Sequence, residues 1–152
     1  MGDPAPAYAA SVWRNVVVSV WARGGNEAEV RELLGRITTT AEAHEGRAGA
    51  LMVILEHCSL PSTDARKAAG EFIRVPGRIA HMAIVVEGGG FWASAMRSVF
   101  SLLGLVYRPQ GPWKMVQSVE EALAWQSEHL VDGEESEDAL RRLIGDLRRQ
   151  LT

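Results

Sequence analysis

One stretch in the middle of the chain restricts the fold more than any other. Residues 78–87 form an almost unbroken apolar run that ends in β-branched residues, and three glycines, Gly88 to Gly90, interrupt it. Apolar side chains then recur at helical spacing (Phe91, Ala95, Val99, Leu102, Leu103) up to Gly104. A continuous apolar run is typical of a strand that is buried on both faces. The stretch therefore predicts a strand, a glycine loop and a helix of an α/β domain.

The rest of the chain repeats this alternation. We predict strands at residues 8–13, 16–21, 50–55 and 113–116, and helices from Asn26 to about Glu45, at 65–75, and after Ser118. Asn26 and Ser118 are residues that favour helix starts, and Ser118 is followed by Glu121 in a capping-box pattern. Strands that alternate with helices predict a mixed, mainly parallel sheet of four or five strands with helices on both faces.

Composition excludes several functional classes. The net charge of −3 gives no reason to expect binding to nucleic acid or to an anionic membrane. A single cysteine, Cys58, excludes an internal disulfide and a cysteine-based zinc site. The chain has no apolar run long enough for a membrane span and no secretory signal pattern, so we expect a cytoplasmic protein without cofactor or metal.

The C-terminal part carries an amphipathic pattern of its own. Leu140, Ile144, Leu147 and Leu151 follow one another at spacings of four, three and four, which is a coiled-coil-like stripe. We divide the chain into a disordered N-terminus (1–7), a domain (8–131), an acidic linker (132–138) and this helix (139–152). A helix this short needs packing, which the domain, a second copy or another protein could provide. The linker favours a homodimer, since it leaves the helix free to move.

Two segments resemble a known family. One is the central strand with its helix, from Arg78 to Phe100, and the other is residues 113–116 followed by the residues 118–125, SVEEALAW. Together they resemble the STAS domain of anti-sigma-factor antagonists, in its divergent bacterial STAS/SEC14-like branch. The resemblance covers about residues 8–130, and its motifs mostly encode packing and capping. It implies a non-enzymatic regulatory or scaffolding module.

A candidate site lies where the resemblance places a phosphorylated residue, at the start of the helix after the second long strand. Ser62, Thr63 and Asp64 stand there, with Arg66 close by. A phosphate would meet the free N–H groups and the positive end of the helix dipole. The family's usual Asp-Ser-x-Gly sequence is missing, and helix starts select Ser and Thr as caps in any case, so capping by Ser62 or Thr63 is the stronger interpretation.

Two loops are candidate partner surfaces. Gly89 and Gly90 precede the aromatic pair Phe91 and Trp92 without the remaining residues of a phosphate-binding motif. One ring can enter the core while the other faces out, and an exposed Trp beside glycines suits a partner. Trp113 and Lys114 follow the rigid segment 108–112; the alternative for Trp113 is that it closes one edge of the core.

His57 and Cys58 are the only close pair of a basic and a nucleophilic side chain in the sequence. Neighbouring residues of a strand point to opposite faces, so the pair predicts an inert, partly buried thiol rather than a catalytic dyad. His81 lies within the predicted central strand and is interpreted as a core histidine.

Three functional hypotheses follow. The first is a regulatory module that binds a protein partner through residues 62–66, residues 88–92 and the C-terminal helix. The second is a small-molecule or lipid-binding module with a pocket between the helices, under Trp92, Val99 and Phe72. The third and weakest is an enzyme that uses Cys58 with a histidine.

Overall fold

The structure is a computed structural model that describes residues 6–130 and 133–152. The strands are β1 (Tyr8–Trp13), β2 (Val16–Trp21), β3 (Gly49–Ile54), β4 (His81–Val86) and β5 (Trp113–Val116). The helices are α1 (Glu27–Ala43), α2 (Thr63–Ile73), α3 (Gly90–Tyr107), α4 (Val119–Ser127) and α5 (Gly133–Gln150). Of the predicted disordered N-terminus, residues 1–5 lie outside the described residues. Ala7 is buried, and its carbonyl accepts a hydrogen bond of 2.9 Å from Ala22 N–H.

The five strands form a single sheet in the order β1-β2-β3-β4-β5. β1 and β2 form an antiparallel hairpin, and each later pair of neighbours is parallel. The predicted α/β class with a mainly parallel sheet is therefore confirmed. β4, the strand on which the prediction rests, lies inside the sheet between β3 and β5.

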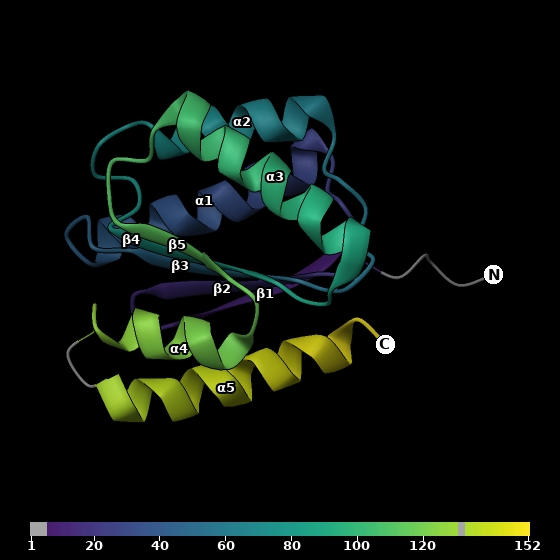
Figure 1. Cartoon of the computed structure of the whole chain (residues 1–152). Helices are drawn as coiled ribbons and strands as arrows, with labels where there is room; N and C mark the ends of the chain where they lie inside the picture. The colour runs from purple at the N-terminus through teal and green to yellow at the C-terminus, as the bar shows by residue number, and fades with distance from the viewer. Residues whose placement is uncertain (1–5, 131–132) are drawn as a thin grey trace.

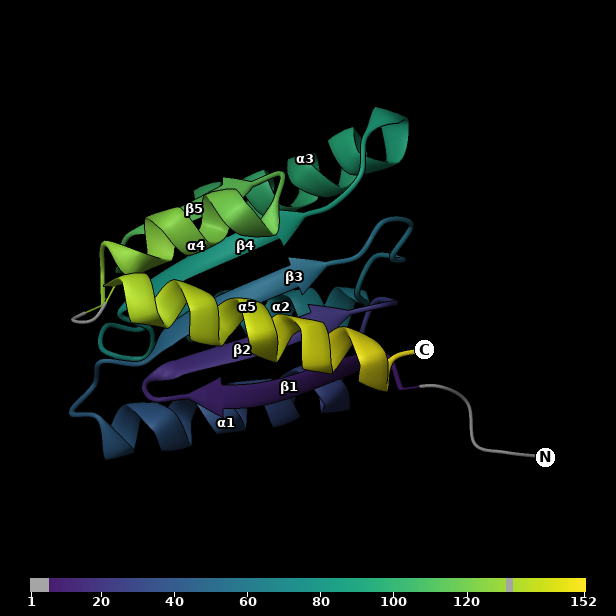
Figure 2. The ribbon, with the colours of Figure 1, turned by 90° about the horizontal axis from the view of Figure 1, so that it is seen from below.

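Helices cover both faces of the sheet (Figures 1 and 2). α1, α2 and α3 lie on one face, and α4 and α5 lie on the other. The position of α1, α2 and α3 on one face follows from the strand order, because β3, β4 and β5 are each added on the same side of the preceding strand. Right-handed crossovers then bring every connecting helix to the same face.

Local signals at the helix starts agree with the structure. Asn26 and Glu29 form a reciprocal capping box at α1, and Ser118 accepts a hydrogen bond of 3.2 Å from Glu121 N–H at α4. Each side chain satisfies an N–H group that has no partner within the helix. These caps explain why the predicted starts of α1 and α4 are correct.

Four predicted segments have wrong boundaries. The helix predicted at 65–75 spans Thr63–Ile73, because Ser62 caps it. α3 continues through Gly104 to Tyr107, and Gly104 leaves room for the ring of Trp113 rather than ending the helix. β4 begins at His81 rather than before it. The predicted acidic linker at 132–138 is largely helical, since α5 begins at Gly133.

The expectation that α5 pairs with a second copy is also wrong. Leu140, Ile144 and Leu147 are buried against β1, β2 and α4 of the same chain, and Leu151 is partly buried beside them. Two bidentate ion pairs hold the helix there, Arg148 with Glu87 (2.6 and 2.7 Å) and Arg141 with Glu120 (2.9 Å each). The stripe covers the sheet and is not available to a partner.

Candidate functional site

The helical layer made by α1, α2 and α3 encloses an apolar cavity against the sheet. Its volume is about 120 Å³, close to the roughly 150 Å³ of an engineered apolar cavity that binds benzene. Natural cores contain few voids larger than a water molecule. A cavity of this size is therefore a structural feature that needs an explanation, and it is the candidate site.

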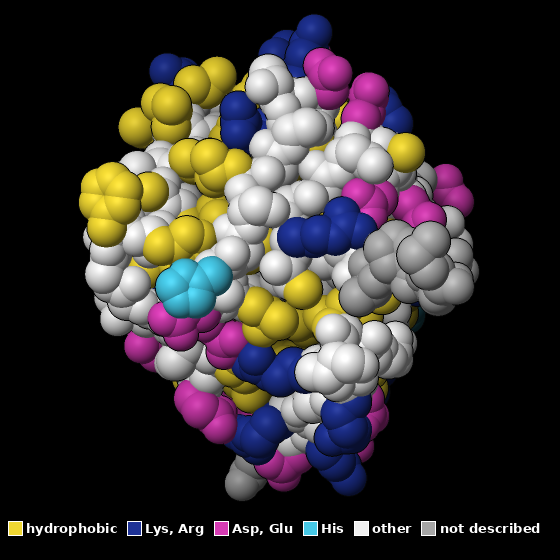
Figure 3. Space-filling view, turned by 90° about the vertical axis from the view of Figure 1, so that its right-hand side faces the viewer, with side chains coloured by type: hydrophobic (Ala, Val, Ile, Leu, Met, Phe, Trp, Pro, Cys, Tyr) yellow, Lys and Arg dark blue, Asp and Glu magenta, His cyan; other side chains and the backbone are white. Residues whose placement is uncertain are grey.

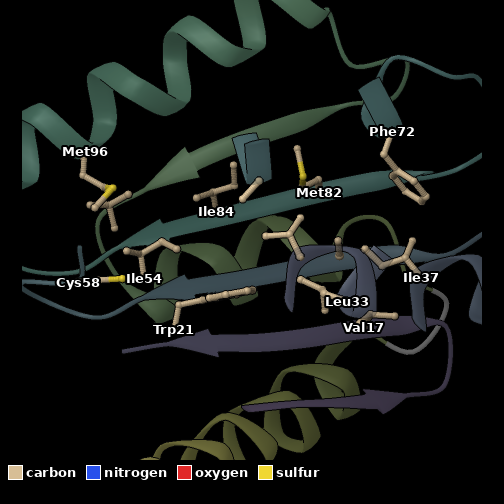
Figure 4. Packing of buried hydrophobic residues seen from close by; sticks show 14 of the residues in the cluster. Val17, Trp21, Leu33, Ile37, Ile54, Cys58, Phe72, Met82, Ile84 and Met96 are labelled. Carbon is tan, nitrogen blue, oxygen red and sulfur yellow. The ribbon is translucent and has the colours of Figure 1, made fainter. Parts of the chain in front are cut away.

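Residues of the strands β2 to β5 and of the helices α1, α2 and α3 line the cavity. Figure 4 shows Trp21, Ile54, Met82 and Ile84 on the strands, with Leu33 of α1 and Met96 of α3 in the same cluster. The apolar lining includes, from the strands, Val17, Trp21, Ala50, Met52, Ile54, Met82, Ile84 and Trp113, and from the helices, Val30, Leu33, Leu34, Ile37, Ala65, Ala69, Ile73, Met96, Phe100 and Leu103. Such a lining binds alkyl groups and repels water.

The lining of the cavity spans the sheet in both directions, across the strands from β2 to β5 and also along them. Its lining extends from Cys58 and Ser59, which follow the carboxyl end of β3, to Ile79, Pro109 and Trp113 at the amino ends of β4 and β5. That is about the length of a six-residue strand, roughly 20 Å. A volume of about 120 Å³ leaves room for a small apolar group such as a short alkyl chain.

A residue in the centre of the sheet confirms that the helices do not cover this face completely. Met52 lies in the middle of β3, the third of five strands, yet it is only partly buried. Its neighbours on the opposite face of the same strand, Leu51 and Val53, are fully buried. The helix-covered face is thus the more open side of the sheet.

Arg66 is the single charged side chain of the lining. Its guanidinium donates to the carbonyl of Pro61 (3.0 Å) and to the hydroxyl of Thr63 (3.3 Å). Among the described residues it has no carboxylate partner. Polar atoms form almost none of the cavity surface, so Arg66 lines it with the carbon atoms of its side chain. Its guanidinium could receive the anionic end of a ligand only at the edge of the cavity.

The structure assigns different roles to the residues at 62–66. Ser62 caps α2, and its hydroxyl accepts a hydrogen bond of 3.1 Å from Ala65 N–H, which confirms the capping interpretation. Ser62, Thr63 and Asp64 are exposed, and Arg66 is half-buried. Phosphorylation of Ser62 or Thr63 stays a prediction. Arg66 was predicted from the sequence as a residue that could contact a phosphate, not as part of a cavity lining.

The glycine loop places its two aromatic residues opposite to the expectation. Trp92 is half-buried and donates from its indole nitrogen to the carbonyl of Cys58 at 2.8 Å, whereas Phe91 is 91% exposed. Gly89 is the N-cap of α3, and Gly90 has a φ of +75°, which favours glycine. The prediction of an exposed Trp is wrong, because the indole N–H of Trp92 donates to a backbone carbonyl, whereas a phenyl ring has no N–H to donate.

The residues named for the predicted pocket are also wrong. The cavity does lie between the helices and the sheet, but Trp92, Val99 and Phe72 are not part of its lining. Phe72 instead packs in the core under the guanidinium of Arg78, 4.8 Å from the ring centre. Trp113 is half-buried at one end of the cavity, and Lys114 is exposed on β5.

Sequence reasoning missed most of the lining because those residues have the pattern of an ordinary core. The signal that could have helped is the density of small residues on the predicted helix at 65–75, where Ala65, Ala69 and Gly70 line the cavity. Small side chains over a sheet leave space that large ones would fill.

His57 and Cys58 do not form a dyad. They lie in the turn after β3 rather than on the strand, with His57 exposed and Cys58 buried within the cavity lining. Burial raises the pKa of the Cys58 thiol to about 11. The thiol is therefore protonated at neutral pH, which opposes the role of a nucleophile.

His81 is buried on the other face of the sheet. The amide nitrogen of Gln126 lies 2.7 Å from its Nδ1, and the exposed ring of His129 stacks on it with 5.2 Å between centres. Burial, with His129 as the smaller cause, lowers the pKa of His81 to about 4. The interpretation as a core histidine agrees with this environment.

The described part of the chain contains no group of three or more His, Cys, Asp or Glu side chains that could hold a metal ion. None of its helices combines the length and hydrophobicity required to cross a bilayer. Comparisons with models of known families, with curated proteins and with solved structures found no significant match.

Proposed function

We propose that this chain is a non-enzymatic binding module that holds the alkyl chain of a small amphiphile in the cavity, with the anionic end of the ligand at Arg66. The observation that carries the proposal is the apolar cavity of about 120 Å³. Leaving such a cavity empty costs about 3 kcal/mol of stability, at about 24 cal/mol per Å³. A ligand that fills it recovers this free energy.

Chain length provides a first test, with straight-chain fatty acids as probes. Each methylene transferred from water to the cavity contributes about 0.8 kcal/mol, so affinity should rise about fourfold per added carbon until the cavity is full. Trp21 and Trp113 line the cavity, so fatty acids that carry bromine on the chain should quench tryptophan fluorescence. Affinity that does not depend on chain length would contradict the proposal.

A cavity-filling variant provides the second test. Ala69 lines the cavity, whereas Ala124 is exposed on α4 across the sheet. Ala69→Leu should abolish binding of octanoate while leaving the protein at least as stable, because the new side chain occupies existing space. Ala124→Leu is the matched control and should bind as the wild type does.

The role of Arg66 is tested with a headgroup comparison. Arg66→Gln should weaken octanoate binding about tenfold but leave octanol binding unchanged, since only the carboxylate uses the guanidinium. Lys67→Gln removes the same charge from the neighbouring, exposed position of α2. Equal losses in both variants would mean that Arg66 contributes only general charge.

A second candidate function is the protein-binding regulatory module of STAS-like fold. What supports the STAS-like fold is a mixed five-stranded sheet in sequential order that begins with an antiparallel pair. What supports a partner surface is the exposed apolar side of α3, which includes Phe91 and Leu105. Both this hypothesis and the first include a cytoplasmic location. Native mass spectrometry separates the two functions: the first expects a bound small molecule, and the second a protein partner without one.

A further inference from the structure

α3 is apolar on the side that faces away from the sheet as well as on the side that faces it. Phe91 is 91% exposed, Leu102 60%, Leu105 74% and Val106 64%. In Figure 3 hydrophobic side chains gather over this helix along the left and upper left of the view. Its inner side, with Met96, Phe100 and Leu103, already covers the cavity. The outer side therefore contributes nothing to the core of this chain.

The outer residues follow a regular pattern. Five of the exposed positions are separated by four, three, four and three residues and form what we call the α3 stripe: Phe91, Ala95, Ser98, Leu102 and Leu105. A spacing that alternates between four and three keeps side chains on one line along a helix and is typical of a surface that packs against another helix.

We propose that the α3 stripe packs against the α3 stripe of a second copy of this chain, antiparallel, with the two-fold axis at Ser98. This inference is independent of ligand binding. In that register Phe91 lies opposite Leu105 of the other copy, and Ala95 lies within one residue of the position opposite Leu102. Small residues in the middle of the stripe thus receive large ones, as a self-complementary two-fold interface requires.

The centre of the stripe can be buried without loss of a hydrogen bond. The Ser98 hydroxyl donates to the carbonyl of Ser94 at 2.9 Å, so it already has a partner within the helix. Arg97, the one charged residue of α3, directs its guanidinium to the carbonyls of Val86 and Gly88, both at 3.4 Å. No charge or unsatisfied hydroxyl of these residues opposes the contact.

Charges at the two ends of the stripe favour the antiparallel arrangement. Glu56 lies against Gly88 just before α3, where a Cβ on the glycine would come within 2.6 Å of the glutamate side chain. Arg108 is exposed just after α3. Antiparallel copies bring Arg108 towards Glu56 and also oppose the two helix dipoles, whereas parallel copies place like charges together.

A second copy fits these observations better than a lipid surface. A bilayer gains little from the small residues Ala95 and Ser98 in the middle of the stripe, and it does not match the opposite charges of Glu56 and Arg108 at the two ends. Covering the large exposed side chains removes roughly 500 Å² of surface per copy. Since standard interfaces bury about 800 Å² per partner, we expect a weak dimer with a Kd in the micromolar range.

Sedimentation velocity of the full chain over about 1 µM to 1 mM tests the proposal. The wild type should change from monomer to dimer within this range. Leu105→Glu should raise the dissociation constant at least tenfold, because it places a carboxylate in the stripe. Thr39→Glu adds the same charge at an exposed position of α1 and should dimerise as the wild type does. A wild type that stays monomeric, or a dimer that Leu105→Glu leaves intact, overturns the proposal.

A mixing experiment tests the register. Phe91→Lys and Leu105→Glu should each be monomeric alone. An equimolar mixture should form a heterodimer, because the ammonium introduced at position 91 of one copy then meets the carboxylate introduced at position 105 of the other. Parallel copies would not bring these positions together, so absence of rescue overturns the antiparallel arrangement. Octanoate binding by Leu105→Glu should equal that of the wild type, which keeps this outcome separate from the proposed function.

Co-sedimentation with vesicles of phosphatidylcholine and phosphatidylglycerol tests the competing explanation. The wild type should remain in the supernatant. Wild-type binding to vesicles that Leu105→Glu abolishes would mean that the stripe contacts lipid, and this result would overturn the proposal of a second copy.

Discussion

His81 is the residue whose environment has the clearest consequence for pH. Its pKa in the folded chain is about 4, below the ordinary 6.5, because the ring is buried. Above pH 6.5 the ring is neutral in both states and does not affect stability. As the pH falls from 6.5 towards 4, His81 is protonated in the unfolded chain but stays neutral in the folded chain. The free energy of unfolding therefore decreases.

We predict that His81 accounts for a loss of about 3 kcal/mol between pH 6.5 and pH 4. His81→Gln should flatten the pH dependence of the free energy of unfolding, measured with urea at several pH values. His57→Gln, at an exposed position, should leave the slope unchanged. Equal slopes in all three proteins would show that His81 titrates normally.

Cys58 provides a second prediction for a single residue. Its pKa of about 11 means that the thiolate is about 100 times rarer at neutral pH than for a free thiol of pKa 9. We expect Ellman's reagent to react with the folded chain at least that much more slowly than with the chain unfolded in urea. Fast labelling of the folded chain would show that the turn after β3 opens readily.

Among the elements, α3 shows how a glycine can be misread from sequence. Gly104 suggests the end of a helix, but a Cβ at this position would lie 2.5 Å from the ring of Trp113. Gly104→Ala should therefore destabilise the chain by about 1–2 kcal/mol, despite the better helix propensity of alanine. Gly35→Ala on α1 meets no atom within 4 Å and should stabilise by about 0.5–1 kcal/mol. Thermal unfolding followed by circular dichroism compares the two, and a stabilised Gly104→Ala would contradict the packing of α3 against Trp113.

Elements with local signals were predictable, and contacts between distant elements were not. The β-branched run at residues 16–21 and the cap at Asn26 identify β2 and α1, because strand propensity and capping depend on near neighbours. The sequence cannot show that Gly104 meets Trp113, nor that small residues of α2 leave a cavity over Met52. The inversion of Phe91 and Trp92 likewise depends on a carbonyl 34 residues away, that of Cys58.

For the whole molecule, α5 is half of a layer rather than an appendage. The apolar stripe of α5 was correctly predicted from the sequence. The helix was nevertheless assigned to a separate segment outside the domain, because periodicity does not indicate which surface a helix covers. In the structure Leu140, Ile144 and Leu147 complete the core beneath β1 and β2.

A pair of variants measures this contribution. Leu147→Ala removes a fully buried side chain and should cost about 2–5 kcal/mol. Leu151→Ala removes a partly buried one from the same helix and should cost less than about 1 kcal/mol. Urea denaturation reports both values, and a negligible cost for Leu147→Ala would mean that α5 detaches readily from the sheet.

The position of α5 beneath the first two strands also matters during synthesis. β1 and β2 leave the ribosome well before α5, the helix that shields their lower face. Until α5 is made, the nascent chain exposes Val16, Val18 and Val20. Such an exposed apolar strand surface promotes aggregation or binding by chaperones. Translation that pauses before codon 140 should thus yield nascent chains that are protease-sensitive, and the passage of α5 out of the exit tunnel should make them resistant.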